Sequence, residues 1–205
     1  MEFDLDAITH PAQRLRILDF DIENRPLSYL GQDFTTGDVT AIAWGWADRE
    51  KVYCGLQTKR ESSLEKMLLD FREAYEEADM VTGHFIRGYD LPVLNGALME
   101  LDIPHLGPKL SCDTKNDLLK RKYLSVSQEN LAEMLGLPEP KIHMNTPRWR
   151  RANRLTPEGV ALSRIRCVGD VVQHKAMRLE LVRRDWLAGP TVWRPGGGPD
   201  GDYAP

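Results

Sequence analysis

The chain has 205 residues and a formal net charge of −4 at pH 7. This length suits one compact α/β domain with a sizeable core that needs no disulfide support. The charge is divided unevenly, because residues 1–103 hold 10 Lys and Arg against 20 Asp and Glu, whereas residues 104–187 hold 16 against 9. A carboxylate metal site beside a phosphate-binding surface would produce such a division, although chance produces it as well.

The three cysteines, Cys54, Cys112 and Cys167, are far apart and form no C-x-x-C pair. This spacing argues against a structural zinc site and against a disulfide framework, and it fits a reducing compartment. The N-terminus is acidic and has no apolar signal core, and no stretch is long and apolar enough to cross a bilayer. We therefore expect a cytoplasmic protein that has no membrane partner.

The first half of the chain alternates between strand-like and helix-like patterns. Residues 14–22, 38–46 and 51–54 are rich in β-branched and aromatic residues, and they predict three strands in an antiparallel meander. The apolar period then becomes that of a helix over 62–77. A short strand over 80–82, a helix over 91–101 and a strand over 110–112 follow.

The C-terminal half is predicted to be mainly helical. A helix over 127–135 has Ser127 as its N-cap and Gly136 after its last turn. A long helix over 156–187 starts at Thr156 and Pro157, and Gly169 is a candidate point for a bend or a break. We divide the chain into an N-terminal extension (1–13), one α/β domain with a mixed sheet (14–187) and a Gly- and Pro-rich tail (188–205) that is expected to be disordered.

Acidic residues alternate along the first predicted strand. Asp21 and Glu23 lie two positions apart, so their side chains point to the same face, about 7 Å apart along the backbone. Two such carboxylates repel each other unless a cation lies between them, and hard divalent ions are bound in this way. A solvated strand end gives the same pattern, and Asp19 is a rival ligand on the same face.

Two further acids are candidates for the same site. Asp90 stands where a buried strand and a glycine turn lead into a helix. A role as the N-cap of that helix would also explain an acid at this position. Asp170 interrupts an otherwise apolar helix face. An acid is costly to bury without a partner, so a metal, a cation or an edge position would each explain it.

These segments together resemble the exonuclease motifs of DnaQ-like (DEDD) 3′–5′ exonucleases, in the form found in family-B DNA polymerases. Phe20-Asp-Ile-Glu23 resembles the first motif, Gly83 to Pro92 the second and Cys167-Val-Gly-Asp-Val171 the third, while Ser127–Leu137 resembles the helix between the last two. The motifs occur in the family's order over most of residues 15–187. The resemblance implies an RNase H-like fold, and it suggests a bacterial or phage-infected cell as the source.

The resemblance implies a metal site and a reaction. Asp21, Glu23, Asp90 and Asp170 would bind two Mg²⁺ or Mn²⁺ ions and hydrolyse phosphodiester bonds by two-metal catalysis, and Asp19 would not be a ligand. The chain departs from the family in its third motif, because Arg166 and Ile165 occupy the places of the family's Tyr or His base. Phe85 also replaces a customary Asn.

Other residues are candidates for contacts with the substrate. His174 follows Asp170 by one helical turn and is a possible substitute base, although a packing role is the commoner explanation. Arg166 is either a phosphate clamp or a surface arginine. Substrate contacts and structural roles both remain open for the rest: His84, Phe85, Arg148, Trp149 and Arg150.

The sequence therefore predicts a 3′–5′ exonuclease. Its expected partner is nucleic acid, foremost single-stranded DNA or DNA 3′ ends, with replication or repair proteins as further candidates. Two alternatives stay open: a ribonuclease or structure-specific endonuclease on the same fold, and a nucleic-acid-binding protein with impaired catalysis. Asp113, which follows a predicted strand, is assigned a structural role.

Overall fold

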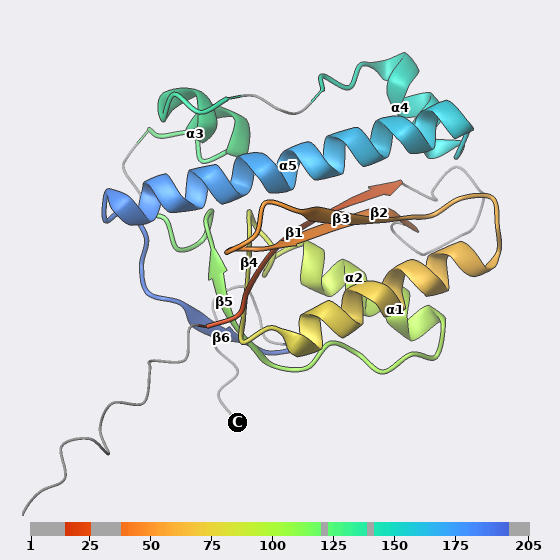
Figure 1. Ribbon diagram of the computed structural model, residues 1–205, viewed down its shortest axis with the longest axis horizontal. Coiled ribbons are helices and arrows are strands. Elements are labelled where there is room, and N and C mark those ends of the chain that lie inside the picture. The colour runs from red at the N-terminus through yellow and green to blue at the C-terminus, as the bar shows by residue number, and fades with distance from the viewer. Residues whose placement is uncertain (1–14, 26–37, 120–122, 139–141, 197–205) are drawn as a thin grey trace, which may run out of the picture.

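A six-stranded mixed sheet forms the centre of the protein, as seen in a computed structural model that describes residues 15–25, 38–119, 123–138 and 142–196. Its strands, in the spatial order β3-β2-β1-β4-β5-β6, are β1 (Ile17–Arg25), β2 (Asp38–Trp46), β3 (Val52–Leu56), β4 (Met80–Gly83), β5 (Lys109–Asp113) and β6 (Thr191–Trp193). The helices are α1 (Ser62–Glu77), α2 (Asp90–Glu100), α3 (Gln128–Met134), α4 (Thr146–Asn153) and α5 (Pro157–Arg183). Helix α5 crosses one face of the sheet, and α1 and α2 cover the other (Figure 1). Among the described residues, none of these helices has the length and low polarity needed to cross a bilayer.

The first three strands form the predicted antiparallel meander. The first strand lies three residues later than predicted, because β1 runs from Ile17 to Arg25 and not over 14–22. Its register against β2 shifts between Glu23 and Asn24, and such a bulge bends and twists a strand. Asp21 and Glu23 therefore lie just before a bulge, near the C-terminal end of β1.

Strands β1, β4 and β5 run parallel, and β1 pairs with β4 only over Ile17–Asp19. Ligands of open α/β sheets bind beyond the carboxyl ends of such strands. Glycine is required where β4 ends: a Cβ at Gly83 would lie 2.2 Å from Ile86 Cγ2 and 2.8 Å from the Phe20 carbonyl oxygen. The loop after β4 is consequently held tightly against β1.

We expect Gly83→Ala to destabilise the protein by about 1–3 kcal/mol, because the added methyl group must push Ile86 and the β1 backbone apart. Gly96→Ala is the matched control, since no atom lies within 4 Å of a Cβ at that position of α2. That variant should gain roughly 0.5–1 kcal/mol from helix propensity. Urea unfolding measures both values, and equal stabilities of the two variants would contradict the close approach.

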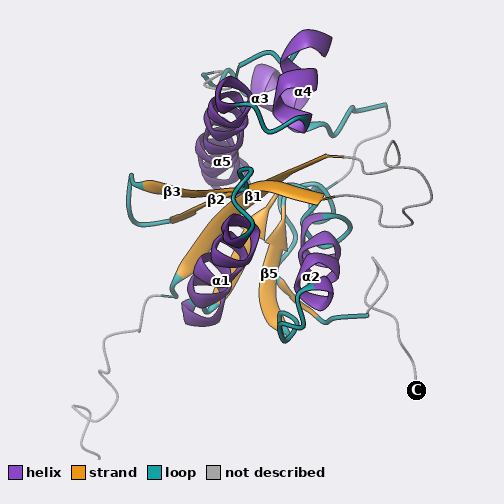
Figure 2. Cartoon of the chain, turned by 90° about the vertical axis from the view of Figure 1, so that its right-hand side faces the viewer, coloured by secondary structure: helices purple, strands orange, loops and turns teal. Residues whose placement is uncertain are grey.

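Helix α5 lies close to the sheet because small side chains meet at its contact with β2. Ala41 and Ala43 of β2 pack against Cys167 and Val171 of α5, and all four are fully buried. The helix starts as predicted, with Thr156 Oγ1 accepting a hydrogen bond from the Gly159 amide at 3.0 Å. It runs through Gly169 without a break and ends at Arg183, four residues before the predicted end. Figure 2 shows α5 with α3 and α4 on one side of the sheet, opposite α1 and α2.

One element contradicts the sequence-based expectation, and another was not predicted. Part of the tail that was predicted to be disordered forms β6, which pairs antiparallel with β5 and buries Trp193. The basic segment around Trp149 is helix α4, capped by Asn145, whose side chain accepts a hydrogen bond from the Arg148 amide. The predicted N-terminal extension and the end of the tail (residues 197–205) lie outside the described residues.

Candidate metal centre

Two rows of polar side chains face each other across the contact between β1 and α5. Two residues of a strand advance about 6.6 Å and four residues of a helix advance about 6 Å. Every second residue of β1 therefore lies opposite every fourth residue of α5. The rows run in opposite directions, because Arg178 pairs with Asp19 while Arg166 pairs with Glu23. The residues of the two rows are Asp19, Asp21 and Glu23 on β1 and Arg166, Asp170, His174 and Arg178 on α5.

Asp21, Glu23 and Asp170 come together across these rows. Each offers a carboxylate oxygen, and the three oxygens lie within 4.8 Å of one another. Oxygen ligands of Mg²⁺ lie about 2.1 Å from the ion, so opposite ligands are roughly 4.2 Å apart. Small side-chain rotations would close the remaining gap. The donor set, made entirely of carboxylate oxygens, therefore fits a hard divalent cation.

Asp90 lies next to this cluster but outside the three-residue set. Its Oδ1 accepts a hydrogen bond from the Ile22 amide of β1 at 3.2 Å, and its negative charge acts on both Asp21 and Glu23. Asp90 is the first residue of α2, and Tyr89 holds the N-cap position, so the N-cap explanation for Asp90 does not apply. This placement suits a contact with a cation through water more than a direct bond.

The loop that leads into Asp90 is anchored by Asp113 at the end of β5. Asp113 Oδ1 accepts a hydrogen bond from the Phe85 amide at 2.9 Å, and Oδ2 accepts one from the Arg87 amide at 3.1 Å. The Arg87 guanidinium in turn pairs with Asp117. Asp113 thus has the structural role that the sequence suggested, and it fixes the position of Asp90.

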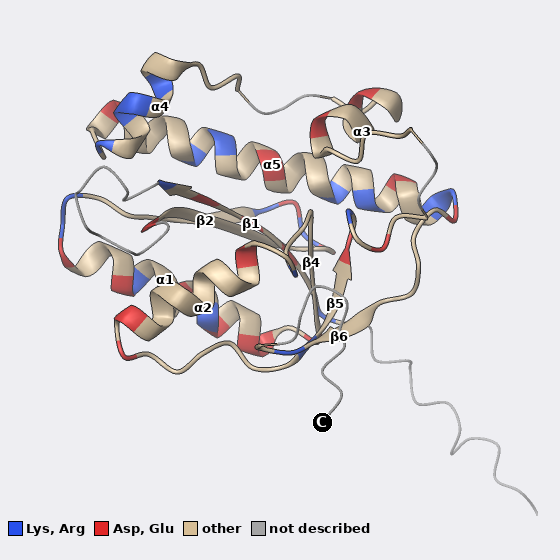
Figure 3. Cartoon of the chain, turned by 180° about the vertical axis from the view of Figure 1, so that it is seen from behind, with Lys and Arg blue, Asp and Glu red and all other residues tan. Residues whose placement is uncertain are grey.

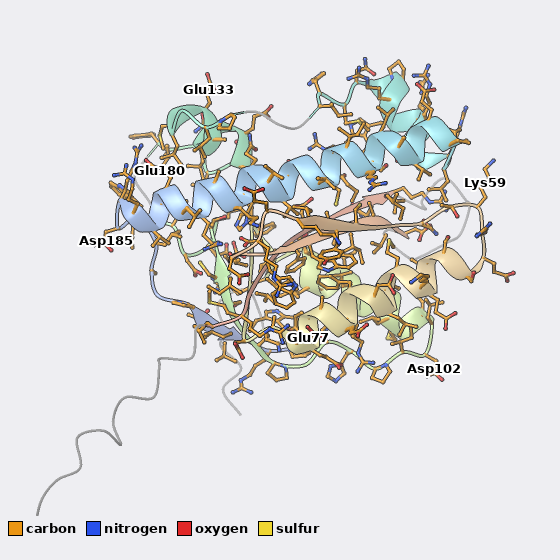
Figure 4. All side chains as sticks on the ribbon, viewed as in Figure 1. Lys59, Glu77, Asp102, Glu133, Glu180 and Asp185 are labelled. Carbon is orange, nitrogen blue, oxygen red and sulfur yellow. The ribbon has the colours of Figure 1, made fainter. Side chains whose placement is uncertain are left out.

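The clustered acids resist ionisation. Burial raises the pKa of Glu23 to about 7 against the opposing charge of Arg166, and burial also raises the pKa of Asp90 to about 7. Burial, together with the charges of Asp170, Asp90 and Glu23, raises the pKa of Asp21 well above its usual range. Acids elsewhere, such as the labelled Glu133 and Glu180, lie at the periphery (Figure 4). A bound cation would relieve the repulsion at the cluster.

These shifts predict a pH dependence of stability in the metal-free protein. Folded Glu23 keeps its proton up to about pH 7, whereas the ordinary pKa is 4.5. Between pH 4.5 and about 7 the folded state therefore binds more protons than the unfolded state. The stability that protonated Glu23 contributes is fully present below pH 4.5 and is lost as the pH rises through 7. Glu23→Gln should gain stability relative to wild type as the pH rises from 5 to 7.5. Urea unfolding in EDTA measures the difference, and a constant or opposite difference would contradict the shift.

Asp19 belongs to a different interaction. Its side chain is fully buried and accepts two hydrogen bonds from Arg178, from Nε and Nη2, each at 2.9 Å. Burial opposes the ionisation of Asp19, but contacts with His174 and Arg178 hold its pKa below the usual range. Arg178 was not singled out in the sequence, although its spacing of four from His174 on α5 was a usable signal.

The placement of His174 does not favour a role as general base. Its Nδ1 lies 3.2 Å from Asp19 Oδ1, a distance that suits an ion pair, but the angle is poor for a hydrogen bond. Both ring nitrogens are sealed from solvent, and the side chain is 2% exposed. A base must reach the attacking water directly or through one further water. The structure instead makes His174 part of the buried pairing with Asp19.

Arg166 lies at the cluster itself. Its Nε is 2.9 Å from Glu23 Oε1 and 3.6 Å from Asp170 Oδ2, and its guanidinium carbon is 5.6 Å from the centre of the Trp149 ring. Trp149 of α4 therefore lies beside the arginine that contacts the acids. On the same helix, Arg148 donates a hydrogen bond to the His143 carbonyl at 2.6 Å, and Arg150 is exposed. Lys and Arg gather on α4 and the neighbouring start of α5 (Figure 3).

His84 and Phe85 lie in the loop between β4 and α2. His84 Nδ1 is 3.0 Å from Thr114 Oγ1, and burial lowers the pKa of His84 to about 4, so its ring is neutral at pH 7. Phe85 has a φ of 72°, an uncommon value for a residue with a side chain, and Lys115 Nζ lies 3.6 Å from its ring centre. Both residues are half-buried in the loop that leads into Asp90.

Comparison with known proteins places the fold in a class. No protein-family model matches the sequence, and the curated proteins include no match either. Among solved structures, the chain is similar to the family B DNA polymerase from the hyperthermophilic archaeon Pyrobaculum calidifontis, with a TM-score of 0.63 and 18% identity. The similarity covers 82% of this chain and 25% of the polymerase chain. At this identity it establishes the fold alone, which is a mixed α/β fold of the RNase H-like class.

Proposed function

We propose that the protein is a metal-dependent 3′–5′ exonuclease that hydrolyses phosphodiester bonds at nucleic-acid 3′ ends, foremost those of DNA. The observation that carries this proposal is the convergence of Asp21, Glu23 and Asp170 on one point, with Asp90 beside them. Acids that lie together with little exposure to solvent destabilise the folded state, and a reaction that depends on bound cations would explain their presence. The polymerase fold similarity and the three exonuclease-like motifs support the same reaction.

In this proposal the residues of the chain have separate tasks. Asp21, Glu23 and Asp170 hold the cations, and Asp90 supports them through water. Two bound Mg²⁺ or Mn²⁺ ions would supply a water of lowered pKa and would stabilise the leaving 3′ oxygen. Asp90 and Asp170 are buried and Asp21 and Glu23 are half-buried, and this low exposure to solvent would strengthen their hold on cations.

Helix α4 is the proposed contact for the substrate backbone. Its exposed Arg150 and the half-buried Arg148 suit phosphate oxygens, which arginine binds through paired hydrogen bonds. Gly159 allows α4 to lie against the start of α5, because a Cβ at this position would be 2.1 Å from the Arg151 carbonyl oxygen. A nucleic-acid end on α4 would then reach the acids on the side where Arg166 and Trp149 lie.

The proposal is tested with single-stranded DNA and RNA labelled at the 5′ end or the 3′ end, each in Mg²⁺, Mn²⁺ and EDTA. We expect a 5′-labelled strand to shorten stepwise, a 3′-labelled strand to release its label as a mononucleotide at once, and EDTA to stop both. A circular strand should stay intact. Cutting of the circle would instead assign the structure-specific endonuclease alternative, and preference for RNA would assign a ribonuclease.

Arg166 favours one second candidate, a nucleic-acid-binding protein without turnover. Its guanidinium neutralises part of the negative charge of Glu23 and Asp170, a task that a metal ion would otherwise have. This candidate predicts that the protein binds single-stranded DNA in Mn²⁺ without cleaving it. Any cleavage by wild type that Asp21→Asn abolishes would exclude it.

A further inference from the structure

The guanidinium of Arg166 lies directly against the acid cluster. Its Nε lies 2.9 Å from Glu23 Oε1 and 3.6 Å from Asp170 Oδ2. These two residues supply two of the three carboxylates that meet within 4.8 Å. The side chain of Arg166 is 24% exposed, whereas those of Glu23 and Asp170 are 11% and 8% exposed, so the arginine reaches the acids from the solvent side.

The charge balance at the cluster explains this position. A guanidinium is not deprotonated in proteins, and that of Arg166 lies against the carboxylates of Glu23 and Asp170. The arginine therefore stays charged and offsets part of the repulsion among the acids. A divalent ion on the same oxygens offsets that repulsion more completely, and it repels the guanidinium at short range.

Arg166 also has favourable partners on the side of α4, away from the acids. Its Nη1 lies 3.5 Å from the Ile142 carbonyl oxygen, and its guanidinium carbon lies 5.6 Å from the centre of the Trp149 ring. Helix α4 is fixed there, because Arg25 of β1 donates a hydrogen bond to the Asn153 carbonyl at 2.8 Å. An aromatic face and a carbonyl oxygen are both favourable partners for a guanidinium.

We propose that Arg166 is a displaceable counter-ion: it occupies the acid cluster while no metal is bound, and metal binding drives it toward Trp149, where it can pair with a substrate phosphate. This inference rests on the proposed function, because it needs the cluster to bind a divalent cation. Metal and guanidinium then compete for Glu23 and Asp170, and the competition weakens metal binding in the absence of substrate. A phosphate that engages Arg166 would relieve the competition, so substrate and metal would bind cooperatively.

The test measures Mn²⁺ binding by isothermal titration calorimetry to the full chain and to Arg166→Gln. Removal of the competitor should lower the dissociation constant for Mn²⁺ roughly tenfold, within the usual range of a coupling between sites. Arg164→Gln, at an exposed position of the same helix, removes the same charge and should change the constant less than about twofold. Arg166→Lys retains the charge without the planar fork and should fall between Gln and wild type.

A second readout follows the movement of Arg166. The chain has five tryptophans, so the contribution of Trp149 is obtained as the difference from Trp149→Phe. Mn²⁺ should change the Trp149 fluorescence of wild type and leave that of Arg166→Gln unchanged. Unchanged or weaker Mn²⁺ binding by Arg166→Gln would overturn the counter-ion proposal while the metal site stands. Failure of wild type and all variants to bind Mn²⁺ would overturn the proposed function as well.

Discussion

The Asp21→Asn substitution is expected to lower 3′-end hydrolysis roughly a thousandfold, because the metal centre supplies several kcal/mol of transition-state stabilisation. The same substitution should raise the stability of the metal-free protein by on the order of 1 kcal/mol. Stability should rise because burial and the neighbouring acids raise the pKa of Asp21 well above the usual range, so the ionised form is unfavourable in the folded protein. Initial rates on 5′-labelled DNA and urea unfolding in EDTA measure the two effects.

A gain in stability with a loss of activity is the expected signature of a functional acid, because ordinary core damage lowers both. Asp70→Asn is the matched control: Asp70 lies on α1, pairs with Lys66 at 2.7 Å and is 43% exposed. It should change stability by less than about 0.5 kcal/mol and leave the rate unchanged. Retention of the rate in Asp21→Asn would exclude this residue from the proposed reaction.

Arg178→Met should lower the free energy of unfolding by about 3–5 kcal/mol, because it leaves the buried carboxylate of Asp19 without its main partner. Asp19 is fully buried, and Arg178 is its bidentate donor, with both hydrogen bonds at 2.9 Å. Methionine fills much of the volume of arginine, so the loss reflects charge more than space. Urea unfolding at pH 7 measures the effect.

The double variant Asp19→Leu with Arg178→Met separates the charge from the packing. Replacing both partners by apolar groups removes the unpaired charge, and we expect it to recover most of the lost stability. Mn²⁺ binding should persist in the double variant, since Asp19 belongs to the ion pair and not to the acid cluster. A single variant that loses less than about 1 kcal/mol would show that the pair contributes little.

Much of the fold was predictable, because local patterns decide it. The β-branched and aromatic residues identified β1 to β3, and the helical period identified α1 over its observed range. Thr156 and Pro157 gave the start of α5 correctly, since a cap and a proline act locally. The end of α5 was placed too late, because the residues after Arg183 retain a helix-like composition.

Two elements, α4 and β6, were not predicted from the sequence. Helix α4 contains a proline and several arginines, and its stability comes from the Asn145 cap and its close contact at Gly159. Strand β6 has three residues among glycines and prolines, and it forms because the edge of β5 is there to pair with it. The edge of β5 is not visible in the sequence around β6, whereas Asn145 and Pro147 are a local start signal for α4 that the sequence analysis did not use.

At the site, the acids were predictable and their surroundings were not. The alternation of Asp21 and Glu23 fixes a shared face on any strand. The register of α5 against β1 is a tertiary property, and it decides that Asp170 joins the acids while His174 faces Asp19. The same register brings Arg166 to Glu23. From the sequence, Arg166 was interpreted only as a phosphate clamp or a surface residue.

Crystals soaked in Mn²⁺ test the central claim most directly, because the anomalous signal locates the ion without reference to activity. We expect a peak bounded by the carboxylates of Asp21, Glu23 and Asp170, at Mn–O distances of about 2.2 Å, with Arg166 moved away from Glu23. The Asp170→Asn crystal should lose or weaken that peak. A protein that shows no peak at these residues at saturating Mn²⁺, or one only elsewhere on its surface, would contradict the metal centre.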